Sequence, residues 1–190
     1  MKGIAARVGE AIVKLQQDDT ENAMLQTITA IDGTARKRFG TRTGNRERFV
    51  RFLADEEDFL IYSAFSFGIH LYVKGRLDFA ELGTLPELIY YSVRNPLVHE
   101  GDIGPGAIFL NREDELSFGF RDEKFMIQPF LVLGLLMLVI GAPENSTMTF
   151  NQRWMLTINE KDIDLNYFWG NLDLLQRQLG FEERPPELVA

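Results

Sequence analysis

Residues 130–142 read FLVLGLLMLVIGA, the longest apolar run in the chain, and Pro143 follows directly. No charged side chain interrupts the run, so a helix formed here is apolar on every side. A membrane-spanning helix needs about 20 such residues, whereas this run has 13. We therefore expect a buried central helix, no membrane span, and further helices that cover it.

Helical patterns precede this run along the chain. Residues 3–16 carry apolar side chains at helical spacing with charges between them. Asp19 and its acidic neighbours fit the cap and first turn of a second helix, which continues through Gly33 and ends near Gly40. We expect Asn45 to cap a third helix that turns its phenylalanines inward.

Two further helices are expected before the central one. Residues 59–72 are rich in aromatic and apolar side chains, and their length favours a helix over a strand. Thr84 is a suitable cap for a helix through Val93, because Pro86 then falls in its first turn. With 190 residues, 45% of them hydrophobic, the chain is expected to form one domain over residues 1–190.

A change of pattern after residue 100 predicts a small β structure. Apolar segments at 108–110 and 116–120 flank a polar stretch and predict a hairpin, and 125–127 predicts a third strand. These segments form an expected β-meander insertion at about 106–128. Residues 154–158 predict another strand, and apolar spacing predicts a C-terminal helix at about 162–180. The expected fold class is mainly α (α+β), a helical bundle with a small antiparallel sheet.

Composition narrows the chemistry. The chain has no cysteine, which excludes disulfides, thiolate catalysis and cysteine-containing zinc sites and fits a reducing cytoplasm. Arg7 interrupts the N-terminal apolar residues, so we expect no export signal. The acidic run 55–58 lacks the spaced oxygen ligands of a calcium loop. It is read as a helix-terminal or solvated cluster, and no metal or cofactor is expected.

Positive charge gathers in one segment of an acidic chain. The net charge is −8, yet residues 36–51 hold seven cations against the single acid Glu47. Such a segment suits contact with RNA, and a solvated helical face is the alternative. The candidate RNA-binding residues are Arg36, Lys37, Arg38, Arg42, Arg46, Arg48 and Arg51.

The chemistry-bearing stretch is Arg94-Asn95-Pro96-Leu97-Val98-His99, which follows the helix expected through Val93. Pro96 disfavours helical geometry at Asn95, so Asn95 is expected to cap a new helix. Arg94 then precedes the cap and His99 takes the fourth helical position. Residues at these two positions meet in a hydrophobic staple, so the guanidinium and the imidazole are expected to share one face.

This stretch resembles the motif of the HEPN superfamily: an arginine, a polar residue that is often asparagine, and a histidine a few residues later. The resemblance implies a HEPN-like antiparallel helical bundle and a metal-independent endoribonuclease of antiviral defence, toxin–antitoxin systems or RNA processing. In such an enzyme Arg94 would stabilise charge on the phosphate, His99 would move a proton and Asn95 would orient them. RNA would be left with a 2′,3′-cyclic phosphate.

The resemblance also implies how the site is completed. One histidine per motif supplies one proton-transfer group, and the family answers this by pairing two motifs across a homodimer. We expect such a two-fold dimer here, and an antitoxin or other protein partner is a further expectation. Gly101 stands where a related variant carries a modified tyrosine, so that regulation is not expected. The alternative function is a non-catalytic dimeric interaction or nucleotide-binding module.

Overall fold

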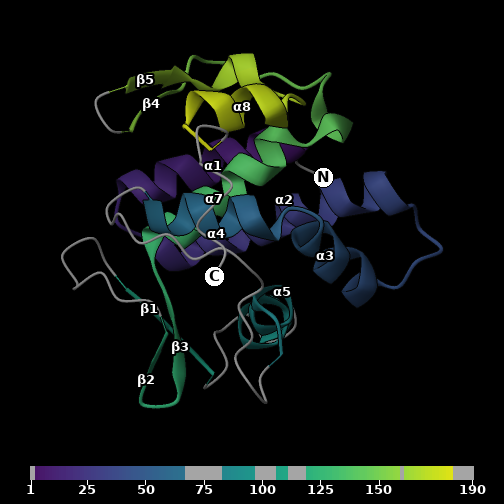
Figure 1. Ribbon diagram of the computed structural model, residues 1–190, viewed down its shortest axis with the longest axis vertical. Coiled ribbons are helices and arrows are strands. Elements are labelled where there is room, and N and C mark those ends of the chain that lie inside the picture. The colour runs from purple at the N-terminus through teal and green to yellow at the C-terminus, as the bar shows by residue number, and fades with distance from the viewer. Residues whose placement is uncertain (1–2, 67–82, 97–105, 111–118, 159–160, 182–190) are drawn as a thin grey trace, which may run out of the picture.

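The computed structural model describes residues 3–66, 83–96, 106–110, 119–158 and 161–181 (Figure 1). Helices dominate these residues and short strands make two small sheets, so the mainly α expectation is confirmed. The helices are α1 (Ile4–Gln16), α2 (Thr20–Phe39), α3 (Asn45–Ala54), α4 (Glu57–Ser66), α5 (Leu85–Ile89), the π-helix η2 (Tyr90–Arg94), α7 (Pro129–Gly141), the 3-10 helices η3 (Pro143–Asn145) and η4 (Leu165–Phe168), and α8 (Leu172–Gln178).

Helix α7 is the expected central helix. It contacts α1, α2, α4 and α8, and Figure 1 shows it among α1, α2 and α4. Val132, Leu135, Leu136 and Met137 have no exposed surface. Burial of each such side chain stabilises the fold by roughly 1.5–3 kcal/mol relative to exposure. Among the described residues, no helix is long and apolar enough to cross a membrane.

The N-terminal helices follow the expected pattern. Helix α1 packs along α2, and Arg7 Nη1 donates a hydrogen bond of 2.6 Å to Gln26 Oε1 between them. Asp19 caps α2 by accepting from the backbone N–H of Asn22. The helix passes Gly33 and ends at Gly40, as predicted. Both boundaries are therefore set by local capping chemistry, which is why the sequence predicts them.

The third helix and the α5 helix confirm their predictions with one small shift. Helix α3 begins at Asn45, but Gly44 rather than Asn45 is its cap. The acidic run 55–58 lies at the junction between α3 and α4, as expected of a helix-terminal cluster. Thr84 and Glu87 form a capping box at the start of α5, which satisfies backbone N–H groups that the first turn leaves without helical partners.

The predicted break at Asn95 is wrong. The helical backbone continues through Asn95 and Pro96, and Asn95 has φ −66° and ψ −50°. Its N–H donates to the carbonyl of Tyr90, five residues earlier, so the turn before the proline is π-helical. A proline ring crowds carbonyls in the preceding turn, and the wider π turn is a local adjustment to it. Asn95 is thus a helical residue, and His99 lies outside the described residues.

The first sheet differs from the predicted meander. Its strand order is β1-β3-β2, from β1 (Ala107–Phe109), β2 (Phe120–Arg121) and β3 (Lys124–Ile127). Strand β1 pairs with β3 in parallel, and the hairpin joins β2 to β3. Asp122 and Glu123 have φ of 51° and 64°, as two-residue hairpin turns of type I′ require. Strand β3 lies at the centre of this sheet, and its residues 125–127 are buried.

The predicted C-terminal helix is too long. Strands β4 (Met155–Ile158) and β5 (Lys161–Asp164) form an antiparallel hairpin, and η4 and then α8 follow. Gly170 separates η4 from α8 with φ +73°. Its N–H donates to the carbonyl of Ile140 at 2.8 Å, and a Cβ at this position would lie 2.3 Å from the Cα of Ser146. This close approach breaks the helix and ties the C-terminal layer to α7.

Arg38 joins three segments at the end of α2. Its Nε donates to Glu144 Oε1 at 2.8 Å, its Nη1 lies 3.4 Å from Asp55 Oδ2 and 4.0 Å from Glu56 Oε1, and its guanidinium stacks on Phe52. Burial raises the pKa of the Glu56 carboxyl above its ordinary value, although Arg38 acts in the opposite direction. The folded protein therefore holds the Glu56 proton more tightly than the unfolded chain does.

We predict that Glu56→Gln raises the melting temperature at about pH 8 and that the gain shrinks as the pH falls toward 4. A raised carboxyl pKa contributes stability below the unfolded value, and that contribution is lost as the pH rises through the folded value. Calorimetry across this pH range measures the effect. Asp58→Asn, an exposed change of equal charge in the same run, is the control. A lower melting temperature for Glu56→Gln at pH 8 would contradict the burial argument.

We also predict that Gly170→Ala destabilises the fold by several kcal/mol, since the added Cβ collides with the backbone at Ser146. Gly40→Ala is the matched control, because Gly40 has a similar φ of +75° and nothing within 4 Å of an added Cβ. It is expected to lose about 1–3 kcal/mol, from backbone strain alone, because Gly40 has φ 75° and ψ −175°. Urea unfolding measures both, and equal losses would show that the contact with Ser146 is unimportant.

Candidate functional site

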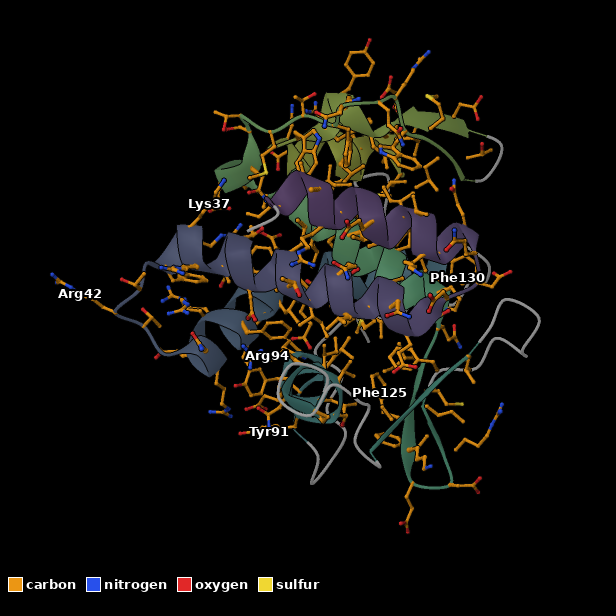
Figure 2. The ribbon with its side chains drawn as sticks, turned by 180° about the vertical axis from the view of Figure 1, so that it is seen from behind. Lys37, Arg42, Tyr91, Arg94, Phe125 and Phe130 are labelled. Carbon is orange, nitrogen blue, oxygen red and sulfur yellow. The ribbon has the colours of Figure 1, made fainter. Side chains whose placement is uncertain are left out.

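Arg94 ends the π turn and points toward helix α2 (Figure 2). Its Nη2 donates a hydrogen bond of 2.9 Å to Oδ2 of Asp32, a residue of α2. The guanidinium carbon lies 5.4 Å from the centre of the Tyr90 ring. Arg94 is 5% exposed, and the Asp32 side chain is 30% exposed. The motif arginine is thus buried just beneath the surface, and its partner Asp32 is partly exposed.

The Arg94–Asp32 contact fixes the direction of the guanidinium. Removing one partner of a largely buried ion pair costs about 3–5 kcal/mol, because a charge is left buried without its counterion. The planar guanidinium fork suits carboxylates and phosphates alike. Asp32 therefore positions a group whose chemistry also fits an RNA phosphate.

The other motif residues are placed only in part. Asn95 is exposed and follows Arg94 at the end of the helical segment. Adjacent side chains on a helix point in different directions, and accordingly Asn95 faces solvent whereas Arg94 is buried. We expected Arg94 and His99 to share one face, but His99 lies outside the described part of the chain. The other histidine, His70, lies outside it too. The roles of Asn95 and His99 stay predictions.

Beside Arg94 lies a line of aromatic rings that reaches the surface. Phe49 packs edge-on against Tyr90 with centroids 5.6 Å apart, and Tyr90 packs against Tyr91 at 5.4 Å and 90°. The guanidinium of Arg46 lies 5.2 Å from the centre of the Tyr91 ring. Figure 2 shows Arg94 and Tyr91 on neighbouring parts of this helical segment. Tyr91 is 54% exposed, so the line of rings runs from buried Arg94 to the surface.

The cations of residues 36–51 lie in different environments. Arg46 lies over Tyr91, and Arg36 is exposed one helical turn beyond Asp32. Lys37 donates to the carbonyl of Glu144 at 3.0 Å, close to the Arg38 contacts described above. Arg51 stacks on Phe39, and Arg48 donates to Thr43 and Asn45. Arg42 is exposed and lies far from Arg94 in Figure 2. Arg46 is linked to Arg94 through the Tyr91 and Tyr90 rings, and Arg36 shares helix α2 with Asp32.

Sequence reasoning missed Asp32 and Tyr91. Asp32 follows Ile31 and comes four residues after Ile28, both fully buried, so its place beside the apolar face of α2 was a readable signal of partial burial. Tyr91 carries no such signal. Its neighbours are of both kinds: Tyr90 and Arg94 are buried, whereas Asn95 is exposed, so the sequence did not separate a packed tyrosine from an exposed one.

Two hollows lie away from Arg94. One of about 770 Å³ runs between α1 and residues 149–154, with Gly9, Phe150 and Trp154 in its walls. The other, of about 570 Å³, includes the acidic run 55–58. Over the described ranges, no group of three or more histidine or acidic side chains is arranged to hold a metal ion. Neither hollow contacts the motif residues.

The comparisons with curated proteins and with solved structures give no match. A family model described as Rv1289 matches residues 3–189, which is nearly the whole chain and includes both the helical core and the motif. The chain belongs to the Rv1289 family.

Proposed function

We propose that the chain is a cytoplasmic, metal-independent endoribonuclease of HEPN type. The observation that carries the proposal is the motif arginine, which Asp32 holds at 2.9 Å next to aromatic rings that reach the surface. A guanidinium fixed in this way is preorganised for charge that develops on a phosphate. The lack of cysteine supports a reducing compartment.

The proposed reaction assigns one task to each motif residue. The 2′-oxygen of RNA forms a bond to the adjacent phosphorus, and the bond from phosphorus to the 5′-oxygen of the next nucleotide breaks. Arg94 stabilises the added negative charge on the phosphate oxygens. His99 accepts the proton of the 2′-hydroxyl or returns one to the leaving 5′-oxygen, since its side chain titrates near neutral pH. Asn95 orients the phosphate.

The reaction needs both a base and an acid, and each motif has one histidine. Two copies of the chain related by a two-fold axis would place one motif opposite the other. One His99 would then serve as base and the other as acid. The proposed enzyme is therefore a homodimer with its active site shared between the subunits.

One observation favours a second candidate, a non-catalytic dimeric interaction or nucleotide-binding module. Arg94 is 5% exposed and already pairs with a carboxylate. A structural ion pair of this kind would retain the motif without turnover. Such a module would bind a nucleotide or a partner chain and leave RNA intact.

Incubation of the purified protein with RNA in excess EDTA tests the proposal. We expect cleavage with 2′,3′-cyclic phosphate ends, detected by mass spectrometry. His99→Ala should reduce the rate by about 10²–10⁴-fold because proton transfer is lost. Arg94→Lys should reduce it by about 10²-fold, because lysine keeps the charge but lacks the guanidinium fork.

His70→Ala is the matched control, since His70 is the other of the two histidines, and it should cleave like the wild type. Circular dichroism checks that each variant folds. Intact RNA with every protein, combined with measurable nucleotide binding, would support the non-catalytic module. Equal cleavage by the wild type and both motif variants would remove the motif from the reaction.

Mixed dimers test the shared site. Wild-type and His99→Ala chains are unfolded together in equal amounts and refolded, so that subunits pair at random. If both histidines of a dimer are needed, activity should fall to roughly a quarter of the all-wild-type value. If each chain works alone, roughly half should remain. A monomer by analytical ultracentrifugation would contradict the dimer directly.

A further inference from the structure

Tyr91 is unusual for its place in the helical segment. Its neighbour Tyr90 is 9% exposed and Arg94 is 5% exposed, whereas Tyr91 is 54% exposed. It extends from the same π turn that presents Arg94. Packing explains Tyr90, which lies between Phe49 and Arg94. Tyr91 lies on the solvent face of this segment, which it shares with Glu87 one turn earlier and exposed Asn95 one turn later, so it presents a large aromatic ring on an otherwise polar face.

Arg46 is held over the Tyr91 ring from another helix. Its guanidinium carbon lies 5.2 Å from the ring centre, and its Nη2 is 3.2 Å from Oε1 of Glu87. The Arg46 side chain remains 51% exposed. Helix α3 and the α5–η2 segment thus present a cation and an aromatic ring on one exposed surface. Cation–π contacts at exposed sites contribute little to folding stability, so stability alone is a weak reason for this contact.

The same surface leads to Arg94. The edge of Tyr91 meets Tyr90 at 5.4 Å, and the Tyr90 ring lies 5.4 Å from the Arg94 guanidinium. A single ring therefore separates the exposed tyrosine from the motif arginine. A nucleotide whose phosphate reaches Arg94 would have neighbouring bases within the region of Tyr91.

We propose that Tyr91 and Arg46 form a nucleobase-stacking platform that positions single-stranded RNA beside Arg94. The inference rests on the proposed function, because it is the endoribonuclease reaction that makes RNA the partner. Aromatic rings and guanidinium planes both stack on unpaired bases. Bases within a duplex are already stacked and cannot reach such a platform, so the platform selects single strands. Arg46 adds attraction for the phosphate backbone.

Binding to a cleavage-resistant RNA tests the platform separately from the chemistry. The probe is a fluorescein-labelled 12-nucleotide RNA with 2′-O-methyl groups, which lacks the attacking hydroxyl, and binding is followed by fluorescence anisotropy. Tyr91→Ala should weaken binding by about tenfold, as loss of a base–aromatic stack does. Tyr91→Phe keeps the ring and should bind within about twofold of the wild type.

Tyr167→Ala is the matched control. Tyr167 is 74% exposed and lies in η4, which packs with α7 and α8 rather than with α5. It should bind like the wild type. The duplex form of the same probe should bind more weakly than the single strand to the wild type, and Tyr91→Ala should reduce that preference.

Cleavage of unmodified RNA is measured in parallel and separates two kinds of failure. If the wild type cleaves RNA and Tyr91→Ala binds and cleaves equally well, the platform is wrong while the proposed function stands. The same conclusion follows if Tyr91→Phe is as weak as Tyr91→Ala, since stacking requires the ring and not the hydroxyl. If the wild type neither binds nor cleaves RNA, both the function and the platform are overturned.

Discussion

The burial of helix α7 is the constraint on which the rest of the structure depends. A helix that is apolar on all sides is stable in water only when neighbours cover its whole circumference. In this chain α1, α2, α4 and α8 do so. The close approach of Gly170 to Ser146 and its hydrogen bond to Ile140 then bind the C-terminal layer at the end of the same helix. The arrangement of the helices thus follows from the need to bury every side of α7.

The burial of α7 also determines where the candidate site lies. Helix α2 packs against α7 through its apolar face, and this places Asp32 at the border between core and surface. From there its carboxylate reaches Arg94 across 62 positions of sequence. The ion pair therefore joins the motif arginine to a helix of the buried core. The packed core thereby fixes the position of Arg94, and the aromatic rings beside Arg94 reach from there to the surface.

The helical core was predictable because local signals and burial agree. Short stretches of sequence are enough to predict three of its features: the apolar run at 130–142, the cap at Asp19 and the Thr84–Glu87 capping box. The π turn before Pro96 was not predictable, because the disfavoured helical geometry at Asn95 is overcome by the continuity of the packed segment. The hairpin turn at Asp122-Glu123 lacks the glycine that usually marks such turns.

The site was predictable only at its motif. Arg94 was identified from spacing, whereas its partner Asp32 is distant in sequence and found only through tertiary packing. The seven cations of residues 36–51 look alike in sequence, yet Arg38 serves an ion-pair network and Arg46 serves the Arg94 surroundings. Charge runs indicate where cations are, and only packing decides which of them face a ligand.

We propose that Asp32 holds Arg94 in readiness for an RNA phosphate. The most direct measurement is the nitrogen-15 NMR spectrum of the arginine side chains, with the Arg94 signal assigned by its loss in Arg94→Lys. Addition of 2′-O-methyl RNA should shift the Arg94 guanidinium signals and leave those of Arg153, on the opposite layer and paired with Asp164, unchanged. An Arg94 signal that stays in place while RNA is bound would contradict the account.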